Sequence, residues 1–207
     1  MESEKDKLSY VIGRQVGGDF KGQGMDLNFP LFLEGIESVY AGAESKLSQE
    51  ESLKVLQEFQ KTLQEKRSAK EAVEAKENLE LSAKFLEENK RKENVVTLDS
   101  GLQYKVIESG QGSTPKASDT VKTHYEGTLF SGEVFDSSYK RGEPISFPVN
   151  GVIKGWQEAL QLMKEGDVWE LFIPSDLAYG KMGSPPVIGP NAGLKFKIEL
   201  LAVNPPA

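Results

Sequence analysis

Three short motifs near the middle of the chain contain the side chains best suited to chemistry. They are His124-Tyr125-Glu126-Gly127, Val134-Phe135-Asp136-Ser137-Ser138 and Val152-Ile153-Lys154-Gly155-Trp156. Together they place aromatic rings, one carboxylate and one indole in a β-rich segment. The chain has no cysteine and one histidine, which excludes thiolate nucleophiles and most metal sites. The predicted site is therefore an apolar pocket with a few polar groups, and its chemistry depends on binding rather than on a reactive side chain.

The composition limits the classes of function. At 207 residues the chain has room for one large domain or two small ones. A net charge of −7 argues against nucleic acid as the main partner, because phosphate binding requires a basic surface. The apolar runs are short, so no transmembrane segment is expected. Residues 1–7 are polar and lack the apolar core of a signal peptide, which predicts either a cytoplasmic protein or one whose signal peptide was removed.

Residues 6–45 are predicted to form two short amphipathic helices. Apolar residues recur at spacings of three and four between Leu8 and Phe20, which is the period of one helical face. Asn28 is a favourable N-cap for the second helix, and Pro30 lies in its first turn. Two helices of this size cannot enclose a core of their own. They either pack on the rest of the same chain or pair with the same segment of a second subunit.

A third, much longer helix is predicted to follow. Ser48 and Glu51 form the capping box that typically opens a helix. No glycine or proline then occurs until Gly101, and strong helix formers extend the prediction to about Glu93, a length of roughly 70 Å. The middle of this helix is mostly charged residues and alanine, which is typical of a solvent-exposed spacer. A heptad coiled coil is poorly supported because the a/d pattern is not sustained.

The C-terminal half is predicted to be a β-rich domain. Residues 121–128 and 194–200 alternate in the way of half-buried strands, and residues 168–173 form a further strand. Between them, apolar residues from Trp156 to Met163 follow a helical spacing. We expect an antiparallel sheet wrapped around this one short helix, because a sheet of that kind buries the apolar stripe.

Several of these motifs resemble the FKBP-type peptidyl-prolyl cis/trans isomerases. The matching motifs are Ser100-Gly101-Leu102-Gln103-Tyr104, His124-Tyr125, Phe135-Asp136-Ser137-Ser138, Val152-Ile153-Lys154-Gly155-Trp156, Ala178-Tyr179-Gly180 and Phe196-Lys197-Ile198-Glu199-Leu200-Leu201. The N-terminal part, with Asp6-Lys7-Leu8-Ser9-Tyr10 and the long helix, is similar to the macrophage infectivity potentiator (Mip) branch of bacterial members. The resemblance covers nearly the whole chain, and it is specific because separate motifs occur in the same order.

The resemblance implies an α+β fold in three parts. These are a helical dimerisation region (residues 1–46), a long connecting helix (47–94) and an isomerase domain (95–207) in which an antiparallel half-barrel sheet wraps around a short helix. It also implies a V-shaped homodimer held together by the N-terminal helices, with no metal and no cofactor. Because the Mip branch contains exported proteins, it favours the periplasm or outer membrane slightly over the cytoplasm.

The resemblance also implies a role for each residue of the pocket. The residues expected to act in catalysis are Tyr125, Phe135, Asp136, Tyr179 and Phe196, and those expected to bind substrate are Arg141, Ile145, Val152, Ile153, Trp156, Val187 and Ile188. Taken without the resemblance, Trp156 is explained as a core residue and Asp136 by turn chemistry. Ile145 stands where the family often has an aromatic residue, and Ser184 stands where a histidine is frequent. Both differences bear on ligand preference, including the preference for macrolide inhibitors.

A pocket of this kind suits the rotation of an X-Pro peptide bond. Resonance gives the bond a rotation barrier of roughly 18–20 kcal/mol, and water favours its planar, charge-separated form. Transfer into an aromatic cavity removes that solvation without any proton transfer. We therefore expect a prolyl isomerase that acts on proline-containing peptides and unfolded proteins. The alternative is a chaperone or adhesive binding module, for unfolded or host proteins, whose isomerase activity is incidental.

Overall fold

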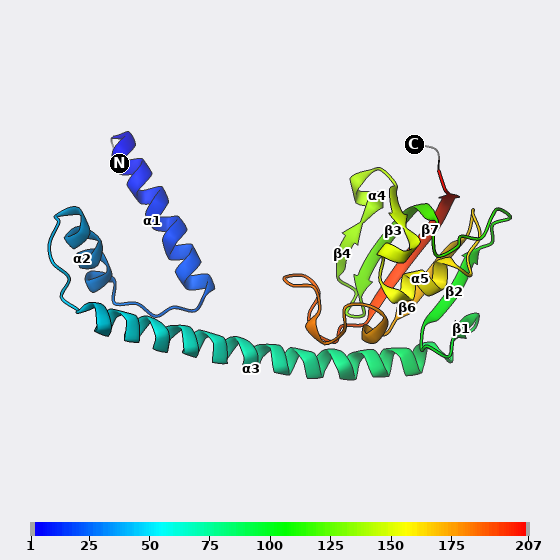
Figure 1. Ribbon diagram of the computed structural model, residues 1–207, viewed down its shortest axis with the longest axis horizontal. Helices are drawn as coiled ribbons and strands as arrows, with labels where there is room; N and C mark the ends of the chain where they lie inside the picture. Colours follow the sequence, from blue (N-terminus) through cyan, green and yellow to red (C-terminus); the bar gives the residue numbers. More distant parts are fainter. Residues whose placement is uncertain (1–2, 206–207) are drawn as a thin grey trace. The chain divides into compact units, whose positions relative to one another are not determined.

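The computed structural model describes residues 3–205, which divide into two compact units between Gln60 and Lys61. The helices are α1 (Glu4–Gly22), α2 (Phe29–Tyr40), α3 (Gln49–Asn89), α4 (Ser138–Arg141) and α5 (Lys154–Leu160), with 3₁₀ turns η1 (Val149–Gly151), η2 (Ser175–Leu177) and η3 (Gly180–Met182). The strands are β1 (Val95–Thr97), β2 (Gln103–Glu108), β3 (Thr120–Leu129), β4 (Val134–Ser137), β5 (Ile145–Pro148), β6 (Val168–Ile173) and β7 (Leu194–Val203) (Figure 1). Within residues 3–205, no helix combines the length and the apolar character that a membrane span requires.

The predicted N-caps of α2 and α3 are confirmed. The side chain of Asn28 accepts a hydrogen bond from the backbone N–H of Leu31 at 3.3 Å. Ser48 and Glu51 form the reciprocal capping box, with the Ser48 hydroxyl accepting from the Glu51 N–H at 3.2 Å and the Glu51 carboxylate accepting from the Ser48 N–H at 2.9 Å. These bonds satisfy backbone donors that the first turn of a helix leaves without partners.

Helix α3 ends at Asn89, earlier than the predicted end near Glu93. The side chain of Asn89 is buried, and its amide donates a hydrogen bond of 2.9 Å to the side chain of Gln103 at the start of β2. This bond ties the end of α3 to the sheet, and the chain then turns into β1. The propensity of the residues after Asn89 allows further helix, but tertiary contacts end it sooner.

The first unit leaves its apolar side chains exposed. None of the residues that the structure describes in α1 and α2 is buried. Phe20 and Phe32 make an edge-to-face contact between the two helices at 5.4 Å, but Val39 and Tyr40 are 78% and 91% exposed. A hollow of about 430 Å³ on α2 is lined by Leu31, Phe32, Gly35, Ile36, Val39 and Tyr40. The helices of this unit therefore do not cover its apolar surface by themselves.

An antiparallel seven-stranded sheet dominates the second unit. Its strand order is β1-β2-β6-β7-β3-β4, and β5 also pairs with β3. The predicted alternation along β3 is confirmed, because Val121, Thr123, Tyr125 and Gly127 are buried while the residues between them are only half-buried. The fold is the predicted α+β arrangement, with helices preceding an antiparallel sheet.

One face of the sheet packs against α5, which appears in yellow in Figure 1. Trp156, Ala159 and Leu160 of this helix are buried in the same core as Leu171 of β6. Helix and strand approach closely at Gly155, where an added Cβ would lie 2.6 Å from Cγ2 of Ile173. Glycine at this position therefore allows the tight packing that sets the depth of Trp156.

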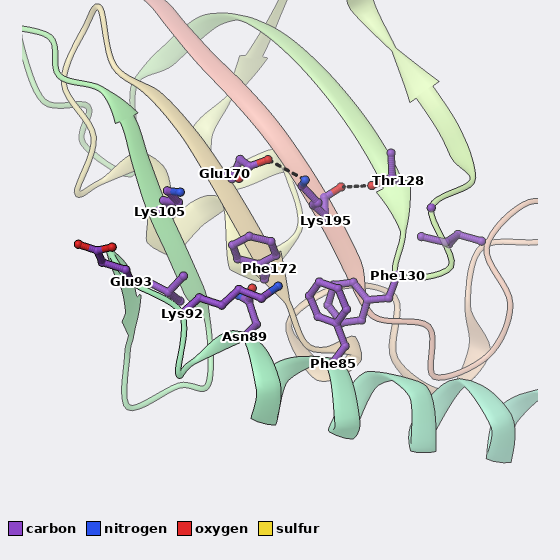
Figure 2. Close-up of a pocket in the computed structure, with 13 residues that line it drawn as sticks. Phe85, Asn89, Lys92, Glu93, Lys105, Thr128, Phe130, Glu170, Phe172 and Lys195 are labelled. Atoms are coloured by element: carbon purple, nitrogen blue, oxygen red, sulfur yellow. Dashed lines mark hydrogen bonds and ion pairs between the residues drawn. The ribbon is translucent and has the colours of Figure 1, made fainter.

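The C-terminal part of α3 packs near the opposite face. Figure 2 shows the ring of Phe85 against that of Phe130, with Phe172 nearby. The centroids of Phe85 and Phe130 are 4.0 Å apart, and those of Phe85 and Phe172 are 5.9 Å apart. Phe172 alternates along β6 with Leu171 and Ile173 of the core, so its side chain lies on the other face of the sheet. A hollow of about 430 Å³ beside this contact is also bordered by Lys92, Glu93, Lys105, Glu170 and Lys195.

Candidate active site

A cavity of about 450 Å³ opens on the helix-bearing side of the sheet. It is lined by Tyr125 of β3, Phe135 and Asp136 of β4, Phe147 of β5, Gly151, Val152 and Ile153 before α5, Trp156 of α5, Tyr179 between η2 and η3, and Phe196 of β7. Segments far apart in the sequence therefore meet at one site. Most of its lining is apolar or aromatic, and the Asp136 carboxylate is its one acidic group.

Trp156 is the centre of an aromatic cluster in this cavity. Its ring makes edge-to-face contacts with Phe196 at 5.2 Å, Tyr125 at 5.3 Å and Phe147 at 5.9 Å. Edge-to-face contacts are a preferred arrangement of aromatic pairs and they hold each ring in a fixed orientation. The indole Nε1 of Trp156 has no hydrogen-bond partner among the residues that the structure describes.

Gly127 determines how two of these rings sit. Phe135 and Phe196 come from the strands on either side of β3, and they meet edge to face at 5.5 Å. A Cβ added at Gly127 would lie 2.6 Å from Cζ of Phe135 and 2.7 Å from Cε1 of Phe196. The absence of a side chain at this position therefore makes room for both rings against the sheet.

Tyr125, Asp136 and Arg141 form a polar network at the edge of the cavity. The Tyr125 hydroxyl donates a hydrogen bond to one carboxylate oxygen of Asp136, and the Arg141 guanidinium donates to the other. Arg141 also donates to the Tyr125 hydroxyl at 2.9 Å, and its guanidinium carbon lies 5.7 Å from the Tyr125 ring centroid. All three groups are therefore held by each other, and the negative charge of Asp136 is balanced locally.

The network fixes the protonation state of its two acids. Burial alone favours a neutral Asp136, but the hydrogen bonds from Tyr125 and Arg141 outweigh it and hold the pKa of Asp136 below its usual value of 3.8. Burial, together with the hydrogen bond to Asp136, raises the pKa of Tyr125 above its usual value of 10.0. At neutral pH the site therefore presents an ionised carboxylate beside a protonated phenol.

Ser138 and His124 support this network from outside the cavity. The Ser138 hydroxyl accepts a hydrogen bond from the Tyr125 N–H at 2.7 Å and lies 3.0 Å from Nδ1 of His124. The His124 ring stacks on Tyr139 at 4.8 Å, on the face of β3 opposite to Tyr125. Burial and the neighbouring Glu199 carboxylate raise the pKa of Tyr139 to about 12. These residues anchor β4 and α4 to β3, and they lie outside the cavity lining.

The structure brings most of the predicted site residues together. Those in the cavity lining are Tyr125, Phe135, Asp136, Val152, Ile153, Trp156, Tyr179 and Phe196. Arg141 is outside the lining but bonded to two of its members. Ile145 packs against the core from the start of β5, Ile188 is itself buried in the core, and Val187 is exposed on the loop between β6 and β7. These last three residues do not border the cavity.

Phe147 and Gly151 line the cavity but were not among the predicted site residues. A signal for Phe147 exists in the sequence, because Ile145 and Phe147 are separated by one polar residue and such residues share one face of a strand. No comparable signal exists for Gly151. Its place in the lining depends on how η1 leads from β5 into α5.

Comparisons with known proteins agree with this geometry. Residues 111–201 match the family model described as "FKBP-type peptidyl-prolyl cis-trans isomerase", and residues 5–106 match the "Domain amino terminal to FKBP-type peptidyl-prolyl isomerase". "Outer membrane protein MIP" of Legionella longbeachae is 48% identical over 99% of this chain and 88% of that protein. "Peptidyl-prolyl cis-trans isomerase Mip" of Coxiella burnetii is 46% identical over 99% of this chain and 89% of that protein.

A solved structure resembles the whole chain. The crystal structure of FkpA from Escherichia coli is 39% identical, with a TM-score of 0.75 and coverage of 99% of both chains. Two family models together match most of the chain, and two relatives of similar length are more than 40% identical to it. These matches assign the family. The chain belongs to the FKBP-type peptidyl-prolyl cis-trans isomerases and is an enzyme of their Mip- and FkpA-like group.

Proposed function

We propose that the 450 Å³ cavity is the place where this enzyme rotates X-Pro bonds of protein substrates. The observation that carries the proposal is the Tyr125–Asp136–Arg141 network at the edge of a cavity otherwise lined by aromatic and aliphatic side chains. Such a site offers an apolar floor for a proline ring and polar groups at one border. Macrolide inhibitors are proposed to occupy the same cavity.

Removal of water from the peptide bond is the proposed source of catalysis. In water, hydration favours the planar amide, whereas the twisted amide has lost its resonance and is less polar at the carbonyl oxygen. A bond held against Trp156 and Phe196 loses hydration that stabilises the planar form. An acceleration of about 10⁵ requires roughly 7 kcal/mol, which desolvation and better binding of the twisted bond share.

Polar groups then hold the substrate while the bond turns. Tyr179 lies at the rim with 41% of its surface exposed, so its hydroxyl is accessible to a substrate carbonyl. Asp136, kept ionised and bonded to Tyr125 and Arg141, provides a fixed negative charge at the border of the cavity.

Two substitutions test this assignment. Asp136→Leu removes the carboxylate while keeping a side chain of similar size, and Tyr179→Ala removes the hydroxyl at the rim. Both variants should lose most of the isomerisation of a short X-Pro peptide while circular dichroism shows an unchanged fold. Tyr139→Phe, which alters a tyrosine outside the cavity, is the matched control and should retain activity. Full activity in both cavity variants would refute the assignment.

We also propose that the chain is a homodimer joined through α1 and α2. The support is the apolar surface of the first unit, where Val39 and Tyr40 are largely exposed in the single chain. A second copy of the chain can cover these apolar side chains in a symmetric contact. With the two isomerase domains linked in this way, both bind one unfolded client, and the second binding event gains from a high effective concentration.

The alternative is a chaperone or adhesive binding module in which isomerisation is incidental. The same exposed apolar residues of α2 favour it, since they present a surface that an unfolded chain can bind. A fragment that begins at Lys61, where the second unit starts, separates the two functions because it keeps the part of α3 that packs on the sheet. As an isomerase domain it should keep full activity on a short peptide and lose much of its acceleration of protein refolding. If the fragment refolds proteins as fast as the full chain, the N-terminal region does not hold clients.

A location in the periplasm or outer membrane is proposed from the relatives. One of them is named an outer membrane protein, and its match covers 99% of this chain and 88% of that protein. Fractionation of cells that express the complete gene should place the protein in the envelope. Recovery in the cytoplasmic fraction would contradict this location.

A further inference from the structure

One face of α3 lies against the rest of the second unit, and this face is largely polar. Its buried or half-buried residues between Glu74 and Asn89 are Glu74, Ala75, Asn78, Ser82, Phe85, Leu86 and Asn89. They follow spacings of one, three and four, which place them in a single stripe along the helix. Because most of them are polar or small, hydrogen bonds and close backbone approach account for much of the contact, and apolar burial for less of it.

The stripe contacts the loop that joins β6 to β7. Four hydrogen bonds link the helix and the loop. Asn78 Nδ2 donates to the Pro190 carbonyl at 2.9 Å, Asn191 Nδ2 to the Ala75 carbonyl at 3.2 Å, the Gly193 N–H to the Ser82 hydroxyl at 2.9 Å, and the Ser82 hydroxyl to the Asn191 carbonyl at 3.5 Å. Helix and loop also approach closely at Gly193, where an added Cβ would lie 2.7 Å from the Ser82 hydroxyl of α3. The same Cβ would lie 2.3 Å from the ring of Phe130, which follows β3. The return limb of this loop is therefore fixed to α3.

Asn191 bonds both to α3 and to the segment that follows Tyr179. Its side chain donates to Ala75 of α3, while its backbone N–H donates to the carbonyl of Gly180 at 2.9 Å. Gly180 directly follows Tyr179, which lines the cavity. The backbone of Asn191 is left-handed, with a φ of 57°, a conformation that asparagine and glycine tolerate better than other residues. One residue thus joins the connecting helix to the chain segment that carries the rim tyrosine.

We propose that Asn191 is a positioning residue that couples helix α3 to Tyr179 and so sets the orientation of the substrate-binding rim. The coupling rests on the proposed role of Tyr179 in the cavity. In this proposal α3 contributes to the isomerase reaction as well as connecting the two units. The helix holds the end of the β6–β7 loop that leads into β7 through Asn78, Ser82 and the Ala75 carbonyl. Loss of the Asn191 amide frees Gly180 and Tyr179 to adopt other orientations.

Asn191→Gly in the full chain is the direct test. Glycine keeps the left-handed backbone and the N–H to Gly180 but removes the bond to Ala75, so the fold is retained. The protection of the Asn191 backbone amide against hydrogen exchange should fall by about threefold to tenfold, as expected for one lost hydrogen bond. The KM for a short X-Pro peptide should rise at least about twofold with kcat little changed, and the NMR signals of Tyr179 and Gly180 should shift.

Two further variants separate the hydrogen bond from the shape of the side chain. Asn191→Asp keeps that shape but places a carboxylate, which cannot donate, against the Ala75 carbonyl. Its effect on KM should equal or exceed that of Asn191→Gly. The matched control is Asn204→Gly, because Asn204 also has a left-handed backbone, with a φ of 49°, and lies beyond the far end of β7. This control should leave both KM and the Tyr179 signals unchanged.

The outcomes distinguish the coupling from the site assignment. If Tyr179→Ala impairs catalysis while Asn191→Gly and Asn191→Asp match the wild-type KM, the site stands and the coupling is refuted. Faster exchange at position 191 with unchanged KM also refutes the coupling, since the contact then stabilises the loop without orienting the rim. If Tyr179→Ala itself has no effect, the proposed role of Tyr179 fails first. A KM increase in Asn204→Gly as large as in Asn191→Gly likewise overturns the coupling, because the effect is then unspecific.

Discussion

The hydroxyl of Tyr125 on β3 donates a hydrogen bond to the carboxylate of Asp136 on the neighbouring strand β4. The ring of the same tyrosine packs edge-on against Trp156, 5.3 Å away. One side chain thus contributes both to the apolar wall of the cavity and to its polar border. A change in the position of the ring alters the bond to Asp136, so the shape of the cavity and the charge at its edge depend on each other.

Replacement of Gly127 by alanine should impair catalysis by narrowing the cavity. The new Cβ would lie within 2.7 Å of the rings of Phe135 and Phe196, which must move away from the sheet. Overpacking of this kind typically costs roughly 1–3 kcal/mol of folding stability. Because both displaced rings line the cavity, we also expect kcat/KM for a short X-Pro peptide to fall by about tenfold, which corresponds to about 1.4 kcal/mol in the activation free energy. Thr128→Ala, at the next position and on the opposite face of β3, should retain activity. Equal activity of both variants would show that the rings tolerate displacement.

The charge on Asp136 predicts a simple dependence on pH. Its pKa is lower in the folded protein than the usual 3.8, because Tyr125 and Arg141 donate to the carboxylate. A lowered pKa means that the contribution of this carboxylate to folding is present above pH 3.8 and is lost as the pH falls through the folded-state pKa. Activity and thermal stability should therefore show no transition from this group between pH 5 and 8, a range that lies about one unit or more above its usual pKa.

Asp136→Asn provides the comparison for this prediction. The amide cannot ionise, so the part of the acid-induced loss of stability that belongs to Asp136 should be absent from the thermal unfolding of this variant at low pH. Tyr125 and Arg141 remain in place, which limits the change to the carboxylate. A fall in wild-type activity between pH 7 and 5 that Asp136→Asn abolishes would contradict the lowered pKa.

The sequence predicts the fold best where a residue pattern decides the structure locally. The alternation along β3 and the caps at Asn28 and Ser48 are confirmed because pleating and capping depend on residues close in sequence. Most of the expected cavity residues also meet, since the matched motifs lie on strands whose order brings them together. Phe147 joins them through the pairing of β5 with β3, a long-range contact that its own segment does not specify.

The contact of α3 with the β6–β7 loop is the feature of the fold that could not be predicted from the sequence. The residues that make it, such as Asn78 and Ser82, are polar, and polar residues on a helix normally indicate a solvent-exposed face. The prediction of an exposed spacer therefore holds for most of residues 64–77, but Glu74 and Ala75 within it are half-buried and begin the stripe that runs to Asn89. Only the backbone groups that these side chains bond, in a loop more than one hundred positions away, explain why they are there.

The exposed face of α2 predicts that two chains associate. Sedimentation or light scattering should give twice the mass of one chain. Val39→Glu places a charge at an apolar side chain that is 78% exposed in the single chain, so it should shift the equilibrium towards monomers if that side chain is covered by a second copy. Gln57→Glu adds the same charge at a polar position and should leave the mass at that of a dimer. A wild-type protein with the mass of one chain would refute the association.

Occupation of the cavity should change the fluorescence of Trp156. The indole lies in the lining and contacts Tyr125 and Phe196, so a proline ring placed on it alters its surroundings. The second tryptophan, Trp169, is stacked on Tyr104 at 4.3 Å and is absent from the lining, so it should contribute a constant signal. Trp169→Phe isolates the signal of Trp156 while keeping an aromatic ring at position 169.

In the Trp169→Phe variant, titration with an X-Pro peptide should change the emission in a saturable way. The midpoint should agree with the KM for isomerisation of the same peptide wherever dissociation is faster than turnover. The same sequence with alanine in place of proline is the control ligand, since it offers no pyrrolidine ring for the floor of the cavity. If emission stays constant while the peptide is isomerised at the normal rate, the substrate does not rest on Trp156, and the reaction takes place elsewhere on the molecule.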